Sequence, residues 1–207
     1  MDWAAPGCGR SAPAHGHSSH EIPTPSCVLQ WAAQNGKPDN VTALAEAGAD
    51  VDHVGSRGRT ALHWAAHGAH LAAVQACLAS GANPLALDED GDGALHHAVC
   101  TAGGAALVPV LVAAGCNVNS AGKLATRPLH IAAATRDVDA AAALLEAGAD
   151  ANARTESGLT PLHSAAKFGQ PALVRLLASR GALVSAADNE GATALHLAAA
   201  EGHAEVI

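Results

Sequence analysis

Histidines dominate the residues of this 207-residue chain that could do chemistry, since it contains 13 of them. The stretch "TALHWAAHGAH" at residues 60–70 places His63, His67 and His70 within eight residues. His63 and His67 are four residues apart, a spacing that can put two imidazoles on one helix face to chelate zinc. The glutamate of an HExxH motif is absent, and no acidic third ligand follows nearby. The sequence therefore argues against a metal site in this stretch.

A second chemical candidate is "DEDGDG", in which Asp88, Asp90, Asp92 and Gly93 match positions 1, 3, 5 and 6 of a calcium-binding loop. Position 12 of such a loop supplies a bidentate glutamate, and here it is Val99. The preceding "GANPLAL" also breaks the helix that such a loop requires. We interpret the stretch as an exposed acidic turn that suits a basic partner surface.

The remaining chemical motifs are sparse. The segment "HGHSSH" at 15–20, with Cys8 upstream, lacks the paired spacing of a structural metal site. The chain has no GxSxG nucleophile, no Gly-Lys-Ser/Thr phosphate loop and no catalytic cysteine signature. We therefore expect no enzyme activity, no metal or other cofactor, and no small-molecule substrate.

Composition narrows the possible partners and location. The formal net charge is −8 and lysine and arginine do not cluster, so nucleic acid is not an expected partner. No run of about 18 apolar residues predicts a membrane span. The five cysteines form no CxxC pair, which suggests reduced thiols and a cytoplasmic, or alternatively nuclear, location. Aromatic residues make up only 2%, so small side chains must pack closely, as in stacked helices.

Two sequence markers repeat in step along the chain. The motif "TALH" returns as "GALH", "RPLH", "TPLH" and "TALH", and its histidines are spaced by 33, 34, 33 and 33 residues: His63, His96, His130, His163 and His196. A glycine marker has the same four spacings: Gly48, Gly81, Gly115, Gly148 and Gly181. Both series carry the extra residue in the same unit, so the chain is a repeat array.

Each unit predicts two short helices and an extended loop. In the unit at 154–186, Thr160 is a helix N-cap and Pro161 occupies the first helical position, where its missing N–H costs little. Leu162 belongs to the buried stripe, and Gly181 ends the second helix with a positive φ. Neither helix can bury its apolar face alone, so neighbouring units must stack.

This unit resembles the ankyrin repeat, with its T-P-L-H-x-A signature and its period of 33 residues. The resemblance implies an all-α fold, an α-solenoid of stacked helix-turn-helix repeats with short hairpin loops. We expect a disordered tail at 1–22 and an array at 23–207. The expected units are 23–53 (atypical first), 54–86, 87–120, 121–153, 154–186 and 187–207 (truncated last). Ala125 replaces a turn glycine, so we expect that hairpin tip to be distorted.

We expect the repeated threonines, prolines and histidines to be structural. A histidine at the third helical position can complete the helix cap, and stacked helices about 8–10 Å apart keep successive histidines from sharing an ion. The residues assigned to this role are Thr60, His63, His96, His130, Thr160, Pro161, His163, Thr193 and His196. Trp31 and Trp64 follow the same register and are expected to pack half-buried.

The resemblance implies that another protein binds to the hairpin tips and to the concave face of the first helices. The candidate contact residues are Arg57, Arg59, His67, Glu89, Asp90, Asp92, Lys123, Glu156, Leu159, Lys167, Phe168, Asn189 and Glu190. The tips differ in charge from one unit to the next, which can select a partner by complementarity. We expect the array to be monomeric.

Two alternatives remain open. The sequence stops at Ile207, inside the expected second helix of the last unit, so the chain could be the substrate-recognition segment of a larger ligase, kinase or transferase. The resemblance also suggests side-chain hydroxylation of Asn152, which follows Leu144 by eight residues as in substrates of that modification.

Overall fold

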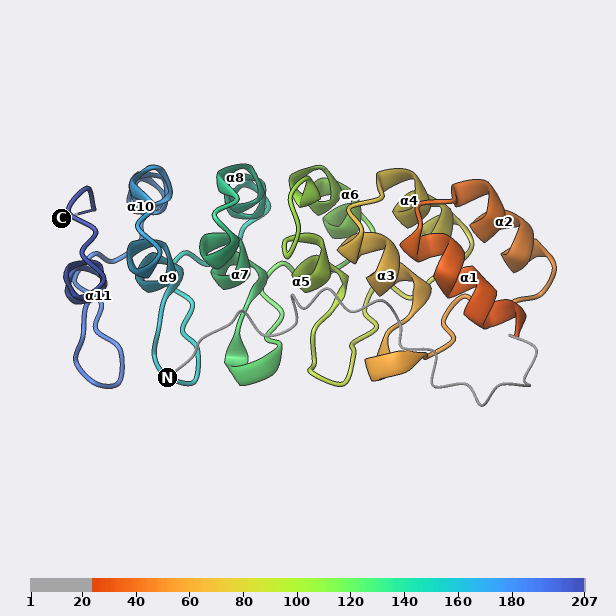
Figure 1. Cartoon of the computed structure of the whole chain (residues 1–207), viewed down its shortest axis with the longest axis horizontal. Coiled ribbons are helices and arrows are strands. Elements are labelled where there is room, and N and C mark those ends of the chain that lie inside the picture. Colours follow the sequence, from red (N-terminus) through yellow and green to blue (C-terminus); the bar gives the residue numbers. More distant parts are fainter. Residues whose placement is uncertain (1–23, 207) are drawn as a thin grey trace.

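The helices of the computed structural model, which describes residues 24–206, stand in two parallel rows (Figure 1). The first helix of each unit lies in the row nearer the hairpin loops: α1 (Pro25–Gln34), α3 (Ala61–His67), α5 (Ala94–Ala98), α7 (Pro128–Thr135), α9 (Pro161–Lys167) and α11 (Ala194–Ala200). The second helices form the other row: α2 (Pro38–Glu46), α4 (Leu71–Ala79), α6 (Val108–Ala113), α8 (Val138–Glu146) and α10 (Pro171–Ser179). Short 3₁₀ turns add η1 (Ser56–Gly58), η2 (Gly104–Leu107) and η3 (Lys123–Ala125).

This arrangement confirms the expected all-α solenoid. Extended pairing between residues 24 and 206 is limited to two isolated bridges, Leu87 with Gly93 and Ala187 with Thr193, at the base of two hairpin loops. Each expected unit from 23–53 to 154–186 contains one helix pair, and the last contains α11. The expected tail at 1–22 and the "HGHSSH" segment lie outside the described residues.

Local sequence explains where the helices begin and end. Five of them start at a proline, whose fixed φ suits the first helical position: Pro25, Pro38, Pro128, Pro161 and Pro171. After the second helices the chain turns at glycines with positive φ, for example 86° at Gly181. An L side chain is disfavoured in that conformation, so these glycines mark the helix ends.

The signature histidines join the helix cap to the next unit. His63 Nδ1 lies 3.0 Å from the backbone nitrogen of Thr60, and His63 Nε2 lies 3.0 Å from the carbonyl oxygen of Ala86. Because Nδ1 accepts an N–H, the ring proton is on Nε2, which donates to the carbonyl. The same two contacts recur at His96, His130 and His163, whose Nε2 atoms lie 3.1–3.2 Å from carbonyls of the following unit.

These imidazoles are neutral in the folded chain. Burial lowers the pKa of His63, His96 and His130 to about 4, and it also lowers the pKa of His163. Gln30, which replaces the histidine in the first unit, bonds similarly, since its Nε2 lies 3.2 Å from the carbonyl of Arg59. The repeat stack is therefore tied by hydrogen bonds between side chains and backbone as well as by apolar packing.

The apolar core runs between the two rows of helices. Leu62, Leu129 and Leu162 occupy the same register position and expose 2% of their surface or less, whereas Leu195 in α11 exposes 43%. Trp31 is 50% exposed, in agreement with the expected half-burial, whereas Trp64 is 6% exposed, so the expectation was wrong for Trp64. α1 and α11 lie at the two ends of the row and are covered on one side by described residues (Figure 1).

Two irregularities of the repeat, Ala125 at a tip and the extra residue of the unit 87–120, change only the local backbone. Ala125 adopts a φ of 55°, close to the 72° of Gly58 and the 80° of Gly158 at the same position of other tips. The expected distortion of this tip was therefore wrong, because alanine takes the left-handed conformation instead. The extra residue of the unit 87–120 falls in its helix region, where α5 is only five residues long and η2 precedes α6.

Candidate protein-binding face

The hairpin tips stand in a row beside the first helices (Figure 1). Backbone hydrogen bonds link tips of neighbouring units: Glu89 N–H donates to Arg57 at 3.0 Å, Glu156 to Leu124 at 3.0 Å and Asn189 to Ser157 at 3.1 Å. These bonds hold the tips at fixed spacing, so the tips and the first helices present one face that a partner could contact at several units together.

In the second and third units this face contains a buried ionic cluster. The Asp88 carboxylate has one oxygen, Oδ2, that lies 3.4 Å from Arg59 Nε and 2.9 Å from His97 Nε2. The Arg59 guanidinium also lies 5.1 Å from the centre of the Trp64 ring, within cation–π range. Burial alone would raise the pKa of Asp88, but the His97 hydrogen bond and the backbone N–H donors together lower it. Asp88 is therefore the counter-ion of Arg59.

The prediction that Arg59 and Asp92 contact a partner is wrong, because both side chains are buried. Arg59 and Asp92 expose only 3% and 5% of their surface. Each lies in its own hairpin, directly after the tip, where the chain returns toward the first helix and the next unit covers it. Burial, followed by repulsion from Asp88, raises the pKa of Asp92 to about 6. These side chains belong to the interior of the stack and are not open to a partner.

The acidic turn that resembled a calcium loop uses its carboxylates internally. Asp88 Oδ1 accepts N–H bonds from Asp90 and Asp92 at 2.9 and 3.0 Å, and Asp90 pairs with Lys123 Nζ at 2.7 Å. Within residues 24–206 no three His, Cys, Asp or Glu side chains converge as metal ligands would. Glu89 remains exposed, so this tip offers a partner less negative charge than its sequence suggests.

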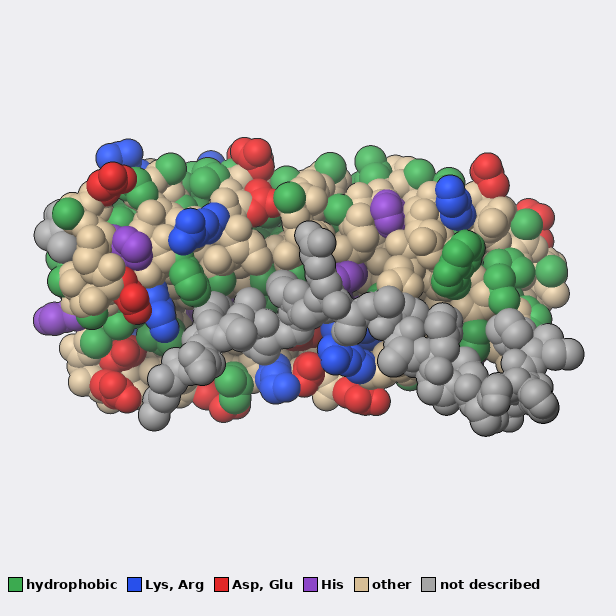
Figure 2. All heavy atoms as spheres, viewed as in Figure 1, with side chains coloured by type: hydrophobic (Ala, Val, Ile, Leu, Met, Phe, Trp, Pro, Cys, Tyr) green, Lys and Arg blue, Asp and Glu red, His purple; other side chains and the backbone are tan. Residues whose placement is uncertain are grey.

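The fifth and sixth units enclose an open hollow of about 430 Å³ between the tips and the helices α9 and α11. Its lining consists of Ser157, Leu159, His163, Ser164, Lys167, Phe168, Asp188, Asn189, Glu190 and Leu197. Acidic side chains gather around the tips at this end of the molecule, on the left of Figure 2. Such a volume is within the range of ligand-binding pockets.

The hollow brings together five predicted contact residues: Leu159, Lys167, Phe168, Asn189 and Glu190. Sequence reasoning missed three of its other lining residues, Ser164, Asp188 and Leu197. None of these three residues belongs to a chemical motif. Only a comparison of equivalent positions in different units could have pointed to them. The lining combines apolar side chains (Leu159, Phe168 and Leu197) with charged ones (Lys167, Asp188 and Glu190), which suits a side chain presented by another protein.

The other predicted contact residues lie elsewhere on the face. Arg57, Glu89, Lys123 and Glu156 are exposed on the tips. His67 is half-buried, its ring centre lies 6.1 Å from that of His97, and its Nδ1 has no hydrogen-bond partner among the described residues. Burial, followed by repulsion from His97, lowers the pKa of His67 to about 4.

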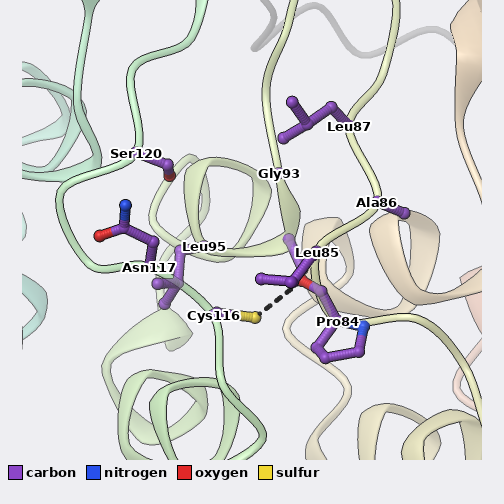
Figure 3. Close-up of a pocket in the computed structure, with 10 residues that line it drawn as sticks. Pro84, Leu85, Ala86, Leu87, Gly93, Leu95, Cys116, Asn117 and Ser120 are labelled. Carbon is purple, nitrogen blue, oxygen red and sulfur yellow. Dashed lines mark hydrogen bonds between the residues drawn. The ribbon is translucent and has the colours of Figure 1, made fainter.

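A second cavity, of about 40 Å³, lies between the loops of the second and third units (Figure 3). Its wall is mostly apolar, and Cys116 Sγ lies 3.1 Å from the carbonyl oxygen of Pro84 across it. The space suits about one water molecule, so it is a packing gap and offers no room for a side chain of a partner.

Asn152, the suggested hydroxylation site, is used in the connection between units. Its Nδ2 donates to the Gly181 carbonyl at 3.0 Å, and its Oδ1 accepts the Leu183 N–H at 2.8 Å. Hydroxylation of Asn152 stays a prediction, to be checked by intact-mass measurement on protein from its native cells.

Comparison with known proteins assigns the class. The chain matches the family described as ankyrin repeats (3 copies) over residues 29–122 and 129–207, and it belongs to that family. A similar curated protein is the palmitoyltransferase Hip14 of Drosophila melanogaster, 41% identical over 70 residues. The match covers 33% of this chain and 11% of that protein, so the chain spans a small part of its relative.

Membership of the family makes the chain a protein-interaction module, since ankyrin repeats bind other proteins and are typically non-catalytic. Among the described helices, none has the length and apolar content that crossing a bilayer requires.

Proposed function

We propose that this chain binds a partner protein across its hairpin tips and first-helix face, centred on the hollow between α9 and α11. The observation that carries the proposal is the convergence of Leu159, Phe168 and Leu197 with charged rim residues in one open cavity of about 430 Å³. Buried apolar contacts with a polar rim are the usual anatomy of a specific protein interface. The remaining tips would extend the contact and set its charge pattern.

The test is affinity capture of partners with the full chain and with a charge-reversed variant, Lys167→Glu with Glu190→Lys. Both residues line the hollow, and reversing both changes its charge pattern while leaving the net charge unchanged. A matched control is Arg175→Glu with Glu46→Lys, at exposed positions of α10 and α2 in the other row of helices. We expect the partner to be lost by the first variant and kept by the second. Equal capture by both variants would contradict the proposal.

A second candidate function is substrate recognition within a larger enzyme, and the similarity to part of a palmitoyltransferase favours a transferase over a ligase or kinase. Sequencing the complete transcript and weighing the native protein test this candidate. A native mass equal to that of the 207-residue chain would rule it out.

We also propose a cytoplasmic location, with the nucleus as the alternative. The thiols of Cys77 and Cys116 are buried and outside disulfides, and burial raises their pKa to about 12 and about 11. Such thiols are typical of reducing compartments. Imaging of the tagged chain in its native cells checks this proposal, which a secretory or extracellular signal would contradict.

A further inference from the structure

Two places in the repeat array can be compared residue by residue. Positions 59, 64, 88 and 97 hold the same register relative to His63 and His96 as positions 159, 164, 188 and 197 hold relative to His163 and His196. Each set spans two neighbouring units, with the same hairpin arms and first helices. The two sets therefore build the same pocket with different side chains.

At the first place the chain fills the pocket with its own arginine. Arg59 reaches Asp88 at 3.4 Å, stacks on Trp64 at 5.1 Å and is 3% exposed. The carboxylate is held in turn by the N–H groups of Asp90 and Asp92. This first pocket shows which group the scaffold accommodates: a guanidinium against an oriented aspartate and an aromatic ring.

At the second place the aspartate is retained and the arginine is absent. Asp188 Oδ1 accepts N–H bonds from Glu190 and Ala192 at 2.9 Å each, which repeats the turn around Asp88. Leu159 stands where Arg59 stands, and Leu197 replaces His97. Among residues 24–206 no Lys, Arg or His side chain forms an ion pair with Asp188.

The substitution of smaller side chains opens the second place. Ser164 corresponds to Trp64, and the volume that Arg59 and Trp64 fill in the first place is part of a hollow of about 430 Å³ in the second. Phe168 lines this hollow and supplies an aromatic ring, while Leu159 and Leu197 supply apolar walls. The hollow thus keeps the oriented aspartate, has an aromatic ring from a different position of the repeat, and lacks the arginine itself.

We propose that this hollow binds an arginine side chain of a partner polypeptide, with its guanidinium on Asp188 and its stem between Leu159 and Leu197. This inference rests on the proposed function and names the chemistry that the site recognises. Arginine fits better than lysine because its planar guanidinium can donate to a carboxylate and stack on a ring at the same time. Glu190 at the rim adds negative charge, so the two carboxylates outnumber Lys167 in the lining.

The binding test uses four short probe peptides of the form acetyl-Gly-Ser-X-Ser-Gly-amide, in which X is arginine, lysine, citrulline or glutamate. Each is titrated into the ¹⁵N-labelled full chain, and amide shifts of Ser164, Lys167 and Leu197 report occupancy. We expect the arginine peptide to bind, and citrulline, its neutral isostere, to bind at least about tenfold more weakly. Equal shifts with arginine and citrulline would overturn the inference.

Variants place the binding in the hollow. Leu159→Arg places an arginine at the position that corresponds to Arg59. It should prevent binding of the arginine peptide while the chain stays folded. Asp188→Asn keeps an oxygen for the Glu190 and Ala192 N–H groups but removes the charge, and should weaken binding about tenfold. Asp150→Asn is the matched control, since Asp150 Oδ1 accepts the Asn152 N–H at 2.9 Å in a similar turn outside the hollow. Unchanged peptide binding in Leu159→Arg would overturn the inference.

If the hollow binds something other than a partner's arginine, different measurements will show it. A concentration-dependent dimer in sedimentation that Leu159→Arg abolishes would assign the hollow to a second copy of the chain. Peptide binding that appears only in Arg10→Ala would assign it to the chain's own N-terminal segment, since Arg10 is the one arginine in the sequence of residues 1–23. Either result overturns the inference. If the captured partner survives Leu159→Arg and Asp188→Asn but is lost on Lys167→Glu with Glu190→Lys, the inference fails while the proposed function stands.

Discussion

At the scale of single residues, the same side-chain type serves the structure differently according to what the next unit places beside it. His63 and His196 both end the sequence "TALH", and both imidazoles cap their helix through Nδ1, at 3.0 and 3.1 Å from the threonine nitrogen. His63 also bonds Ala86, at the boundary with the next unit, and is 1% exposed, whereas His196 is exposed. The histidine between two units therefore contributes more to stability.

The substitution His63→Ala tests this difference. We expect a loss of about 2–4 kcal/mol in the free energy of unfolding, because it leaves the Ala86 carbonyl and the Thr60 N–H unpaired and opens a cavity. His196→Ala should lose only the cap, about 1 kcal/mol. Urea unfolding followed by circular dichroism measures both. A loss at position 196 as large as at position 63 would refute the role given to the inter-unit bond.

Two aspartates of one tip make a second contrast. Asp88→Ala should cost about 3–5 kcal/mol, because Arg59 is left as a buried charge without its counter-ion. Asp90→Ala removes only the exposed pair with Lys123 and should cost less than about 1 kcal/mol. Thermal unfolding of the two variants separates these values, and unfolding of the chain by Asp90→Ala would show that the tip is wrongly assigned.

At the scale of the helix, burial of the leucine in the repeated motif depends on the unit that follows it, since Leu29 in α1, at the other end of the row, is 0% exposed. Leu162 in α9 lies between two units and is 2% exposed, while Leu195, its counterpart in α11, is 43% exposed. Leu162→Ala should cost about 2–5 kcal/mol, as for a buried leucine, and Leu195→Ala less than about 1 kcal/mol. Unfolding midpoints in urea give the comparison, and similar losses at the two sites would contradict this account of the stack.

At the scale of the hairpin, the tip with Ala125 keeps the shape that other units obtain with glycine. Ala125→Gly should raise the free energy of unfolding by up to about 1 kcal/mol, because alanine is strained at a φ of 55°. Ala143→Gly, inside α8, should instead lower it by about 1 kcal/mol. Thermal melts of the two variants check the signs, and a less stable Ala125→Gly protein would argue against the left-handed tip.

At the scale of the whole molecule, the buried histidines make stability depend on pH. Those with a lowered pKa are His63, His67, His96, His97, His130 and His163. The unfolded chain takes up protons below pH 6.5, while the folded-state pKa is about 4 for His63, His67, His96 and His130. Burial also lowers the pKa of His97 and His163. The contribution of these histidines is therefore complete above pH 6.5 and is lost as the pH falls toward 4.

Asp92 opposes this trend, because its pKa is raised to about 6 in the folded chain. Protonated Asp92 therefore contributes fully to stability below pH 3.8, and this contribution is lost as the pH rises through 6. Six histidines outweigh one carboxyl group, so the urea midpoint should fall steadily between pH 7 and pH 4.5. Asp92→Asn should steepen the fall, and a midpoint that rises on acidification would contradict the neutral histidines.

The sequence by itself determined the repeat, its period, the helix caps and the all-α stack, because these follow from local patterns such as "TPLH" that recur at fixed intervals. It also named five residues of the hollow. Only the tertiary structure decided that Arg59 and Asp92 are interior and that Asp188 faces an open space. The reason is physical: the burial of a hairpin arm depends on the unit packed against it, about one repeat away in the chain. Arg59 and Leu159 occupy the same place in the repeat, and the residues of the next unit distinguish a filled pocket from an open one.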